Sequence, residues 1–336
     1  VLALIGVLAS GLTGYYAYTD SRELILRAAE ERLLTATRVL ANQFLIGLEN
    51  NARDVQLLAG DPRAELALRT PPGPERKKAE DDLAALFGEM MKTHPSYFQI
   101  RLIDANQHGI ERVRIDRDVG GLLRVEGDDL QEKGHFPYVF NTLQQAPDTA
   151  HFSKPVINRE AGAHAGEGKP SLDLSIPIYD QGDVPLGLVV INVDLEGKFR
   201  QLATELPKGI GLYLANRSGD FLVHPDSSQA FAFDQGRRAR IQDQFPSTSV
   251  LYEEHELQVA PAVKEAQSLR QGVVSAFVKQ PLNTPQQNVF FVLGLSQPLS
   301  EVLRESDALG RDIQKIVLAF SALSVALAIP VSYTHL

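Results

Sequence analysis

Two charge-free segments at the ends of the chain most limit what it can fold into. Residues 1–18 and 316–334 contain no Asp, Glu, Lys or Arg, and a membrane-spanning helix needs about 20 mostly apolar residues. We therefore expect a transmembrane helix at each end, with residues 19–315 forming a large region on one side of a membrane. Three tyrosines gather at the inner end of the first segment, as aromatic side chains do at a membrane interface.

Each apolar segment has one alternative interpretation. The first could be a signal peptide, although it has neither a basic start nor an A-x-A cleavage site. The second could be a buried core helix, although Lys315 directly before it suits a membrane interface. The last five residues, SYTHL, extend no pattern and could be foreign to the natural chain.

Composition excludes several classes of function. The net charge is −9 and basic residues form no long run, whereas nucleic-acid binding needs clustered Lys and Arg. The chain has no cysteine, so disulfides and cysteine-based zinc sites are impossible. The eight histidines lack metal-ligand spacing, and no G-x-S-x-G, P-loop or G-x-G-x-x-G motif occurs. We expect no catalytic residue, no metal, no cofactor and no nucleic-acid partner.

A long amphipathic pattern follows the first apolar segment, over Asp20–Ala59. Apolar residues recur every three or four positions, which predicts a helix with one apolar face. They are Leu33, Ala36, Leu40, Phe44, Leu48, Ala52 and Val55. At 1.5 Å per residue this helix would be about 60 Å long, and we interpret it as a stalk. The alternative is two shorter helices with a break near Asn50 and Asn51.

The period changes to two after a break at residues 60–75 and a helix at 76–93. YFQIRLID and IERVRID alternate around the turn ANQHG, which predicts a β-hairpin. A helix over 130–143, a strand HFSKPVI, a second hairpin from LDLSIPIYD and LGLVVINVDL, and a short helix EGKFRQLATEL are expected next.

The second half of the chain repeats this order. LYLANRSGDFLVH predicts another hairpin, and both first hairpins turn through A-N-x-x-G, at Ala105–Gly109 and Ala215–Gly219. A loop and helix region at 226–271 and a last hairpin, GVVSAFVKQ and NVFFVLGLS, follow. The repeat predicts two similar modules. His224 and Asp226 then end a strand, and no third ligand supports a metal site there.

This organisation resembles a double Cache domain, the extracytoplasmic sensor of bacterial membrane receptors, over Asp20–Ile313. The resemblance implies an α+β fold, with a long N-terminal stalk helix, two stacked PAS-like antiparallel-sheet modules and two flanking transmembrane helices. The expected units are 1–18 (first span), 19–75 (stalk and linker), 76–205 (membrane-distal module), 206–300 (membrane-proximal module), 301–315 (return helix) and 316–334 (second span).

The resemblance also implies a ligand site in the distal module. The amino-acid-binding branch of the family uses an Arg-x-Trp pair, a nearby Tyr and an Asp that ends the last strand. In KGHFPY, Lys133 or His135 lies near the place of the Arg, Phe136 near that of the Trp, and Tyr138 near that of the Tyr. Asp194 fits the place of the Asp. The Arg-x-Trp pair itself is absent, which puts recognition of α-amino acids in doubt.

Strand alternation adds further candidates for the same pocket. Tyr97, Gln99 and Arg101 would share one strand face, opposite apolar residues that pack on the stalk. Asp173 and Ser175 alternate with apolar residues on a later strand. The alternative is that the charged members are solvated strand faces and the aromatic ones are core. The complete candidate set is Tyr97, Gln99, Arg101, Lys133, His135, Phe136, Tyr138, Asp173, Ser175 and Asp194.

We interpret the chain as the sensing region of a bacterial inner-membrane receptor, with the sensor in the periplasm and a small organic acid or amino-acid-like molecule as ligand. A histidine kinase is the favoured cytoplasmic output; a diguanylate cyclase and a chemotaxis transducer are alternatives, as is an adhesion ectodomain without a small ligand. A homodimer is expected, with the apolar stripe of the stalk in its seam, unless that stripe packs on the sheets.

Overall fold

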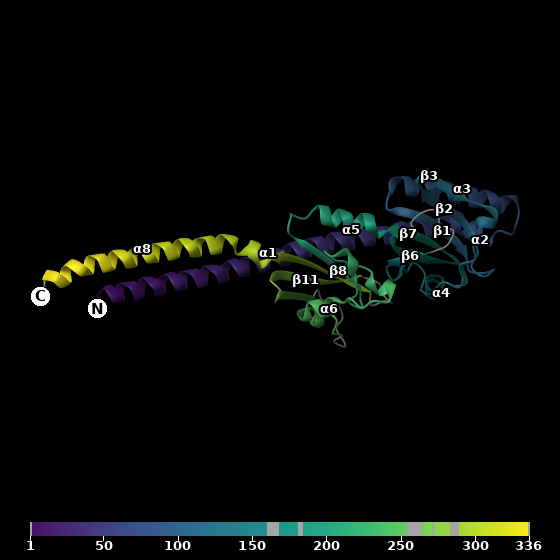
Figure 1. Ribbon diagram of the computed structural model, residues 1–336. Helices are drawn as coiled ribbons and strands as arrows, with labels where there is room; N and C mark the ends of the chain where they lie inside the picture. Colours follow the sequence, from purple (N-terminus) through teal and green to yellow (C-terminus); the bar gives the residue numbers. More distant parts are fainter. Residues whose placement is uncertain are drawn as a thin grey trace.

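One continuous helix organises the molecule. The computed structural model describes residues 2–159, 168–180, 184–253, 264–270, 272–282 and 289–334. Helix α1, Leu2–Ala59, runs from the end that holds both termini past one sheet to the other (Figure 1). It has no break near Asn50, because its sequence from residue 20 onward contains no proline to interrupt the hydrogen bonds.

Two further helices complete the N-terminal part. Helix α3, Pro74–Thr93, lies where the sequence predicts a helix. Helix α2, Pro62–Arg69, lies within the expected break. Asp61 accepts a hydrogen bond from the Arg63 N–H and Pro62 occupies the first turn, so a cap and a proline start a helix here rather than only ending one.

The sheet farther from the termini, here called the distal sheet, has seven antiparallel strands. Their order is β3-β2-β1-β7-β6-β4, and β5 pairs with β6. The strands are β1 Tyr97–Asp104, β2 Glu111–Asp118, β3 Gly121–Val125, β4 His151–Phe152, β5 Val156–Ile157, β6 Pro170–Tyr179 and β7 Pro185–Asp194. Both hairpins expected from the sequence are present, as β1–β2 and β6–β7. The expected strand HFSKPVI is divided into β4 and β5 around Pro155.

The helix expected at 130–143 is shorter than predicted. Only α4, Pro137–Leu143, is α-helical, with a 3-10 turn, η1, at Gly127–Asp129. The residues between them bond to the β1–β2 hairpin instead. The Lys133 N–H donates to the Gly109 carbonyl at 2.8 Å and the Glu111 N–H donates to the Gln131 carbonyl at 3.0 Å. Because their backbone groups pair in this way, residues 130–136 cannot continue a helix.

The sheet nearer the termini, here called the proximal sheet, follows helix α5, Leu195–Thr204. It has five antiparallel strands in the order β10-β11-β12-β8-β9. They are β8 Gly211–Ala215, β9 Phe221–Val223, β10 Lys264–Arg270, β11 Val273–Pro281 and β12 Phe290–Pro298. Strand β10 was not expected from the sequence. Helix α6, Ile241–Gln244, and the 3-10 turns η2 Ser227–Gln229, η3 Ala232–Gln235 and η4 Pro246–Leu251 lie between β9 and β10.

The β8–β9 hairpin turns through A-N-x-x-G, as the sequence predicts. The Asn216 side chain accepts hydrogen bonds from the N–H groups of Ser218 and Asp220, and Gly219 has a φ of +85°. A side chain that bridges the turn and a glycine at positive φ are what such a turn requires. His224 pairs with Gln244, and the part of the chain described here holds no cluster of His, Asp and Glu that could bind a metal.

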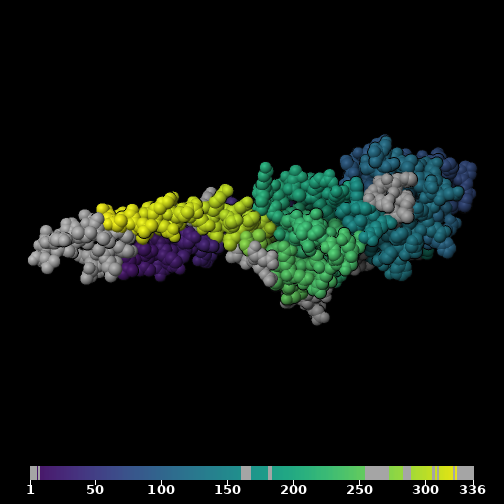
Figure 2. All heavy atoms as spheres, viewed as in Figure 1, coloured from purple at the N-terminus to yellow at the C-terminus, as the bar shows by residue number. Residues whose placement is uncertain are grey.

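Helices α7, Leu299–Val302, and α8, Arg304–Thr334, return alongside α1. Figure 2 shows the result as two lobes at one end of a narrow stem. Within the described residues no helix is both long enough and apolar enough to be recognised as a membrane span. The two apolar end segments thus form the outer parts of α1 and α8, and the two spans stay predictions.

The apolar stripe of α1 packs inside the chain. Leu33, Leu40, Phe44, Leu48 and Val55 are buried in one core cluster with residues of both sheets. They have no surface left for a second subunit. The expectation that this stripe forms a dimer seam is therefore wrong, and the alternative, packing on the sheets, is correct.

Candidate ligand-binding site

A group of four buried charges lies on the face of the distal sheet that points away from α1. Ile100 and Leu102 of β1 share the core with α1, so the alternating Arg101 points to the other face, where α4 packs. Arg101 and Arg114 are cross-strand partners. With Glu111 and Asp116 they form what we call the buried charge cluster, in which each side chain is at most 2% exposed.

Glu111 holds the two arginines together. Its carboxylate oxygens lie 3.4 Å from Arg101 Nη1 and 3.3 Å from Arg114 Nη1. Arg114 also forms a bidentate pair with Asp116, at 2.9 Å from Nε and 2.7 Å from Nη2. This fork geometry orients both guanidinium groups, since their planes are fixed by the carboxylates.

Amides extend the cluster across the sheet. Gln99 Nε2 donates to Asp116 at 2.9 Å, and Arg101 Nη2 donates to the Asn192 side chain at 3.0 Å. Asn192 in turn donates to Asp173 on β6 at 2.5 Å. A connected polar network therefore runs from β2 through β1 and β7 to β6, and its buried members lie in surroundings where an unpaired charge would be costly.

The segment before α4 and α4 itself cover this network. The Arg101 guanidinium lies 5.3 Å from the centre of the Tyr138 ring, and Lys133 Nζ lies 5.1 Å from that of Phe136. Lys133 is buried and donates to Gln131 at 2.7 Å. The hydroxyls of Thr142 and Ser175 are 2.6 Å apart. Cations, aromatic rings and hydroxyls thus surround one polar region beneath a helix.

His151 lies at the edge of the same sheet face, on β4 opposite Ser175. Its side chain is buried, and burial lowers its pKa to about 4. The imidazole is therefore neutral at neutral pH, with one nitrogen able to donate and the other able to accept a hydrogen bond.

The structure brings together most of the residues named from the sequence. Seven of them border the network or its cover: Gln99, Arg101, Lys133, Phe136, Tyr138, Asp173 and Ser175. Arg101 is fully buried, so the alternative that it is a solvated strand residue is wrong. His135 is exposed beside Phe136, with ring centres 4.3 Å apart.

Tyr97 and Asp194 have other positions. A bulge at Phe98 shifts the pairing of β1 with β7, so Tyr97 points to α1, where its hydroxyl donates to Asn51 at 3.0 Å and Asp54 at 2.5 Å. The prediction that Tyr97 shares a face with Gln99 and Arg101 is therefore wrong. Asp194 caps α5 by accepting from the N–H groups of Glu196 and Gly197.

The sequence interpretation missed the residues of β2. Glu111, Arg114 and Asp116 look like the polar positions of a half-exposed strand, between Val113 and Ile115. The pairing of β2 with β1 was itself predicted. Placing Arg114 beside Arg101 in that pairing would have indicated that two cations needed nearby carboxylates.

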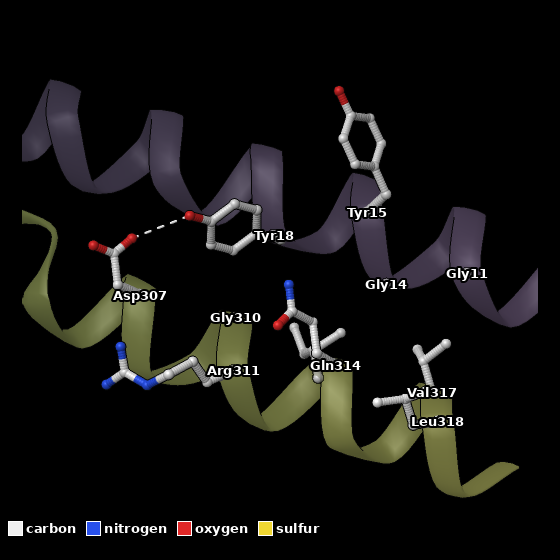
Figure 3. A pocket seen from close by; sticks show the side chains of 11 residues that line it. Gly11, Gly14, Tyr15, Tyr18, Asp307, Gly310, Arg311, Gln314, Val317 and Leu318 are labelled. Atoms are coloured by element: carbon white, nitrogen blue, oxygen red, sulfur yellow. Dashed lines mark hydrogen bonds between the residues drawn. The ribbon is translucent and has the colours of Figure 1, made fainter. Parts of the chain in front are cut away.

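A separate cavity of about 630 Å³ lies between α1 and α8. Figure 3 shows Tyr18 reaching across to Asp307, whose carboxylate accepts its hydrogen bond at 3.1 Å, while Tyr15 points away from α8. A Cβ on Gly14 would lie 2.9 Å from the Ile313 side chain, and one on Gly310 would lie 2.7 Å from Tyr18. Glycines thus permit the two helices to pack closely here.

The family model described as "Bacterial histidine kinase, sensor domain" matches residues 55–254. The chain belongs to this family. The matched residues of this sensor domain include the buried charge cluster, α4 and the first hairpin of the proximal sheet. The sensor domain matches no curated protein.

Solved structures share the fold at low sequence identity. One is the extracellular domain of a protein assigned as a histidine kinase, vpHK1S-Z8, with a TM-score of 0.65, 17% identity, and coverage of 83% of this chain and 96% of that chain. Another is the periplasmic sensory domain of the Campylobacter jejuni chemoreceptor Tlp1, with a TM-score of 0.57 and 15% identity. The match covers 83% of this chain and 98% of that chain. A third is the ligand-binding domain of the Pseudomonas fluorescens chemoreceptor CtaA in complex with L-serine, with a TM-score of 0.50 and 16% identity. The match covers 81% of this chain and 98% of that chain.

Proposed function

We propose that this sensor domain binds a small organic acid or amino-acid-like ligand between the distal sheet and α4. Two modules, residues 76–205 and 206–300, would then pass the signal through α1 and α8 to a cytoplasmic output domain, with a histidine kinase favoured. The observation that carries the proposal is the buried charge cluster: two arginines and two carboxylates, each at most 2% exposed, beneath an aromatic cover.

The cost of such a cluster supports a role beyond stability. Buried ion pairs repay the loss of hydration poorly, and apolar replacements are often equally stable. A binding site has a reason to keep them, because fixed guanidinium groups recognise carboxylates and fixed carboxylates recognise an ammonium group. Lys133 adds a cation at the cover, and the aromatic rings of Phe136 and Tyr138 would enclose the rest of a small ligand.

The comparisons support this ligand class and output. L-Serine is the ligand in the CtaA complex, which has the same fold. The family of this chain is that of histidine kinase sensor domains. A chemotaxis transducer is the alternative output, because the chemoreceptor Tlp1 is also similar in fold.

The arrangement of α1 and α8 supports a membrane receptor, and the likeness in fold to the periplasmic sensory domain of Tlp1 supports a sensor in the periplasm. Both apolar end segments lie beyond the two sheets and side by side, which is how two spans would leave one domain (Figure 1). Ligand binding would favour one of two relative positions of these helices, by a small slide or rotation. The contact between Tyr18 and Asp307 would move with them.

A homodimer would use another side of α1 than the buried stripe. On α1 from residue 20 onward, four large apolar residues are 53–67% exposed: Leu24, Val39, Ile46 and Leu57. Their spacings of 15, 7 and 11 residues keep them within about 60° around a helix that turns 100° per residue. Pairing of two copies along this side would hold two α1 helices next to each other.

A thermal-shift screen tests the ligand proposal. The whole chain, purified in detergent, would be melted with the standard amino acids and small di- and tricarboxylates. A ligand that binds only the folded state raises the Tm. Arg101→Lys, which keeps the positive charge beside Glu111 but lacks the guanidinium fork, should reduce the rise. If no compound raises the Tm, or the rise is unchanged in Arg101→Lys, the proposal is wrong and a protein-binding ectodomain becomes the better interpretation.

A further inference from the structure

A second cavity, of about 540 Å³, lies between the two lobes. Its distal wall consists of α4 and the segment from β4 to β5, and its proximal wall consists of the β8–β9 turn and the start of β12. We call it the inter-module cavity. The lining residues are Pro137, Tyr138, Asn141, His151, Phe152, Ser153, Lys154, Pro155, Asn216, Arg217, Ser218, Val289, Phe290 and Phe291.

The charge of this lining is opposite to that of the chain. The chain has 42 acidic and 33 basic residues, yet among the residues that the structure describes the lining contains no Asp or Glu. It contains two cations, one from each wall, Lys154 and Arg217. These two cations give the described lining a positive field. An anion is the ligand that this field favours.

The polar groups of the cavity are held by the fold. Lys154 Nζ lies 4.7 Å from the centre of the Phe233 ring, so the proximal lobe positions a cation of the distal lobe. His151 is only 5% exposed, and within the described residues its Nδ1 has no hydrogen-bond partner. A buried ring nitrogen without a partner is costly, and a ligand in the cavity could supply that partner.

Both walls of the cavity also supply aromatic rings. Tyr138 and Phe152 belong to the distal wall, and Phe290 and Phe291 belong to the proximal wall. A volume of about 540 Å³ falls within the usual range of about 300–1,000 Å³ for small-molecule sites. The site therefore suits a molecule with one charged end and an apolar body.

We propose that the inter-module cavity is a second ligand site, which binds a small carboxylate with an aromatic or aliphatic body. The carboxylate meets Lys154 and Arg217, and the body packs on the phenylalanines. Such a ligand touches both lobes, so its binding fixes one relative position of the two sheets. No member of the buried charge cluster lines this cavity, and the inference does not depend on the ligand proposed for that cluster.

The test uses paired acids and amides. Benzoate, phenylacetate and hexanoate, and their neutral amides, would be titrated into the whole chain in detergent by calorimetry. At least one acid should bind, and its amide should bind about 10-fold more weakly or not at all. The double variant Lys154→Ala and Arg217→Ala should weaken the acid by about 10-fold or more, since two charge-assisted hydrogen bonds are lost. Both residues are exposed, so the variant should fold.

A matched control removes two charges elsewhere. Arg200→Ala with Lys208→Ala changes the net charge equally on exposed positions outside the cavity, and it should leave the affinity unchanged. The inference fails if none of the acids binds or if acid and amide bind equally. It also fails if the control weakens binding as much as the double variant. Acid binding that persists in the double variant Lys154→Ala and Arg217→Ala but is lost in Arg101→Lys would place the ligand at the buried charge cluster, which contradicts this inference and leaves the proposed function intact.

Discussion

At the scale of single residues, the unusual feature is charge placed where water is absent. Glu111 bridges Arg101 and Arg114 on neighbouring strands, and Asp116 holds the second arginine from the other side. Glu111 therefore offsets the like-charge repulsion between the two guanidinium groups, and Asp116 adds a second negative charge beside Arg114. Removing one partner would leave a buried charge uncompensated, which commonly costs about 3–5 kcal/mol. The cluster is consequently sensitive to single substitutions in a way that surface ion pairs of this chain are not.

His151 gives a prediction at this scale. Burial lowers its pKa to about 4, while the unfolded chain has a value near 6.5. Between these pH values the unfolded state binds more protons, so the free energy of unfolding falls as the pH decreases from about 6.5 to about 4. The loss should reach about 2–3 kcal/mol, at about 1.4 kcal/mol per pKa unit. Urea unfolding across this pH range measures it.

Two variants isolate this contribution. His151→Gln cannot be protonated, so its stability should fall less than that of the natural chain over the same pH range. His135→Gln, at an exposed histidine, should keep the natural slope. Equal slopes for the natural chain and His151→Gln would show that His151 is not held neutral by burial.

At the scale of elements, the distal lobe depends on close approach between α2 and the sheet. A Cβ on Gly187 of β7 would lie 2.3 Å from the Ile103 carbonyl oxygen and 2.9 Å from the Leu68 side chain. Leu68 belongs to α2, the helix that the sequence interpretation missed. A glycine within a strand thus marks the place where a helix and a neighbouring strand both come near the backbone.

Gly187→Ala should therefore destabilise the protein. The methyl group meets backbone on one side, which cannot move away as a flexible side chain can, so we expect a loss of about 1–3 kcal/mol, the usual cost of overpacking. Gly120→Ala is the matched control, because a Cβ there meets nothing within 4 Å. Thermal or urea unfolding compares the two. If both variants lose the same free energy of unfolding, a methyl group at Gly187 fits beside Ile103 and Leu68 and this prediction is wrong.

The same elements show how far the sequence could predict the fold. Strong alternation predicted β1, β2, β6 and β7, and the A-N-x-x-G turns predicted both first hairpins, because these signals are local. Helix α2 was missed, since prolines and a glycine around it dominate the pattern although Pro62 suits a first turn. The segment 130–136 was predicted as helix because its pairing with Gly109 is a tertiary contact that no local pattern contains.

For the site, the sequence predicted the location better than the chemistry. Arg101, Lys133 and Tyr138 were named and do lie together, because strand alternation and the family pattern both point to that sheet face. Tyr97 was misplaced by the bulge at Phe98, which reverses the face of a residue without any sequence signal. Arg114 was missed because burial of a charged strand depends on what covers it, here the segment before α4.

At the scale of the whole molecule, α1 connects every part. It contacts the proximal sheet, then the distal sheet, and its outer part runs beside α8 (Figure 1). The buried stripe faces the sheets, whereas the side with Leu24, Val39, Ile46 and Leu57 stays available to a second copy. A movement of either lobe along α1 would reach the paired helices through a single rigid element.

The proposed dimer gives a prediction at this scale. Val39→Glu with Ile46→Glu places like charges on the exposed side of α1 and should convert the dimer to a monomer, because two copies would bring these carboxylates together in an apolar contact. Light scattering with size exclusion measures the mass in detergent. Glu31→Gln with Arg38→Gln changes exposed polar positions on the same helix and should leave the dimer intact. If the natural chain is itself a monomer, this pairing along α1 is wrong.

The pairing of α1 with α8 can be tested by cross-linking, because the chain has no cysteine of its own. A Cβ on Gly14 would lie 2.9 Å from the Ile313 side chain, so Gly14→Cys with Ile313→Cys should form a disulfide within one chain, for which Cβ atoms must be about 3.5–4.5 Å apart. Gly11→Cys with Ile313→Cys is the control, since a Cβ on Gly11 meets nothing within 4 Å. Non-reducing gel mobility after mild oxidation should show fast closure for the first pair and slow closure for the second. If a ligand that raises the Tm also changes the closure rate of the first pair, the two helices move on binding. Equal rates for the two pairs would contradict the packing of α1 on α8.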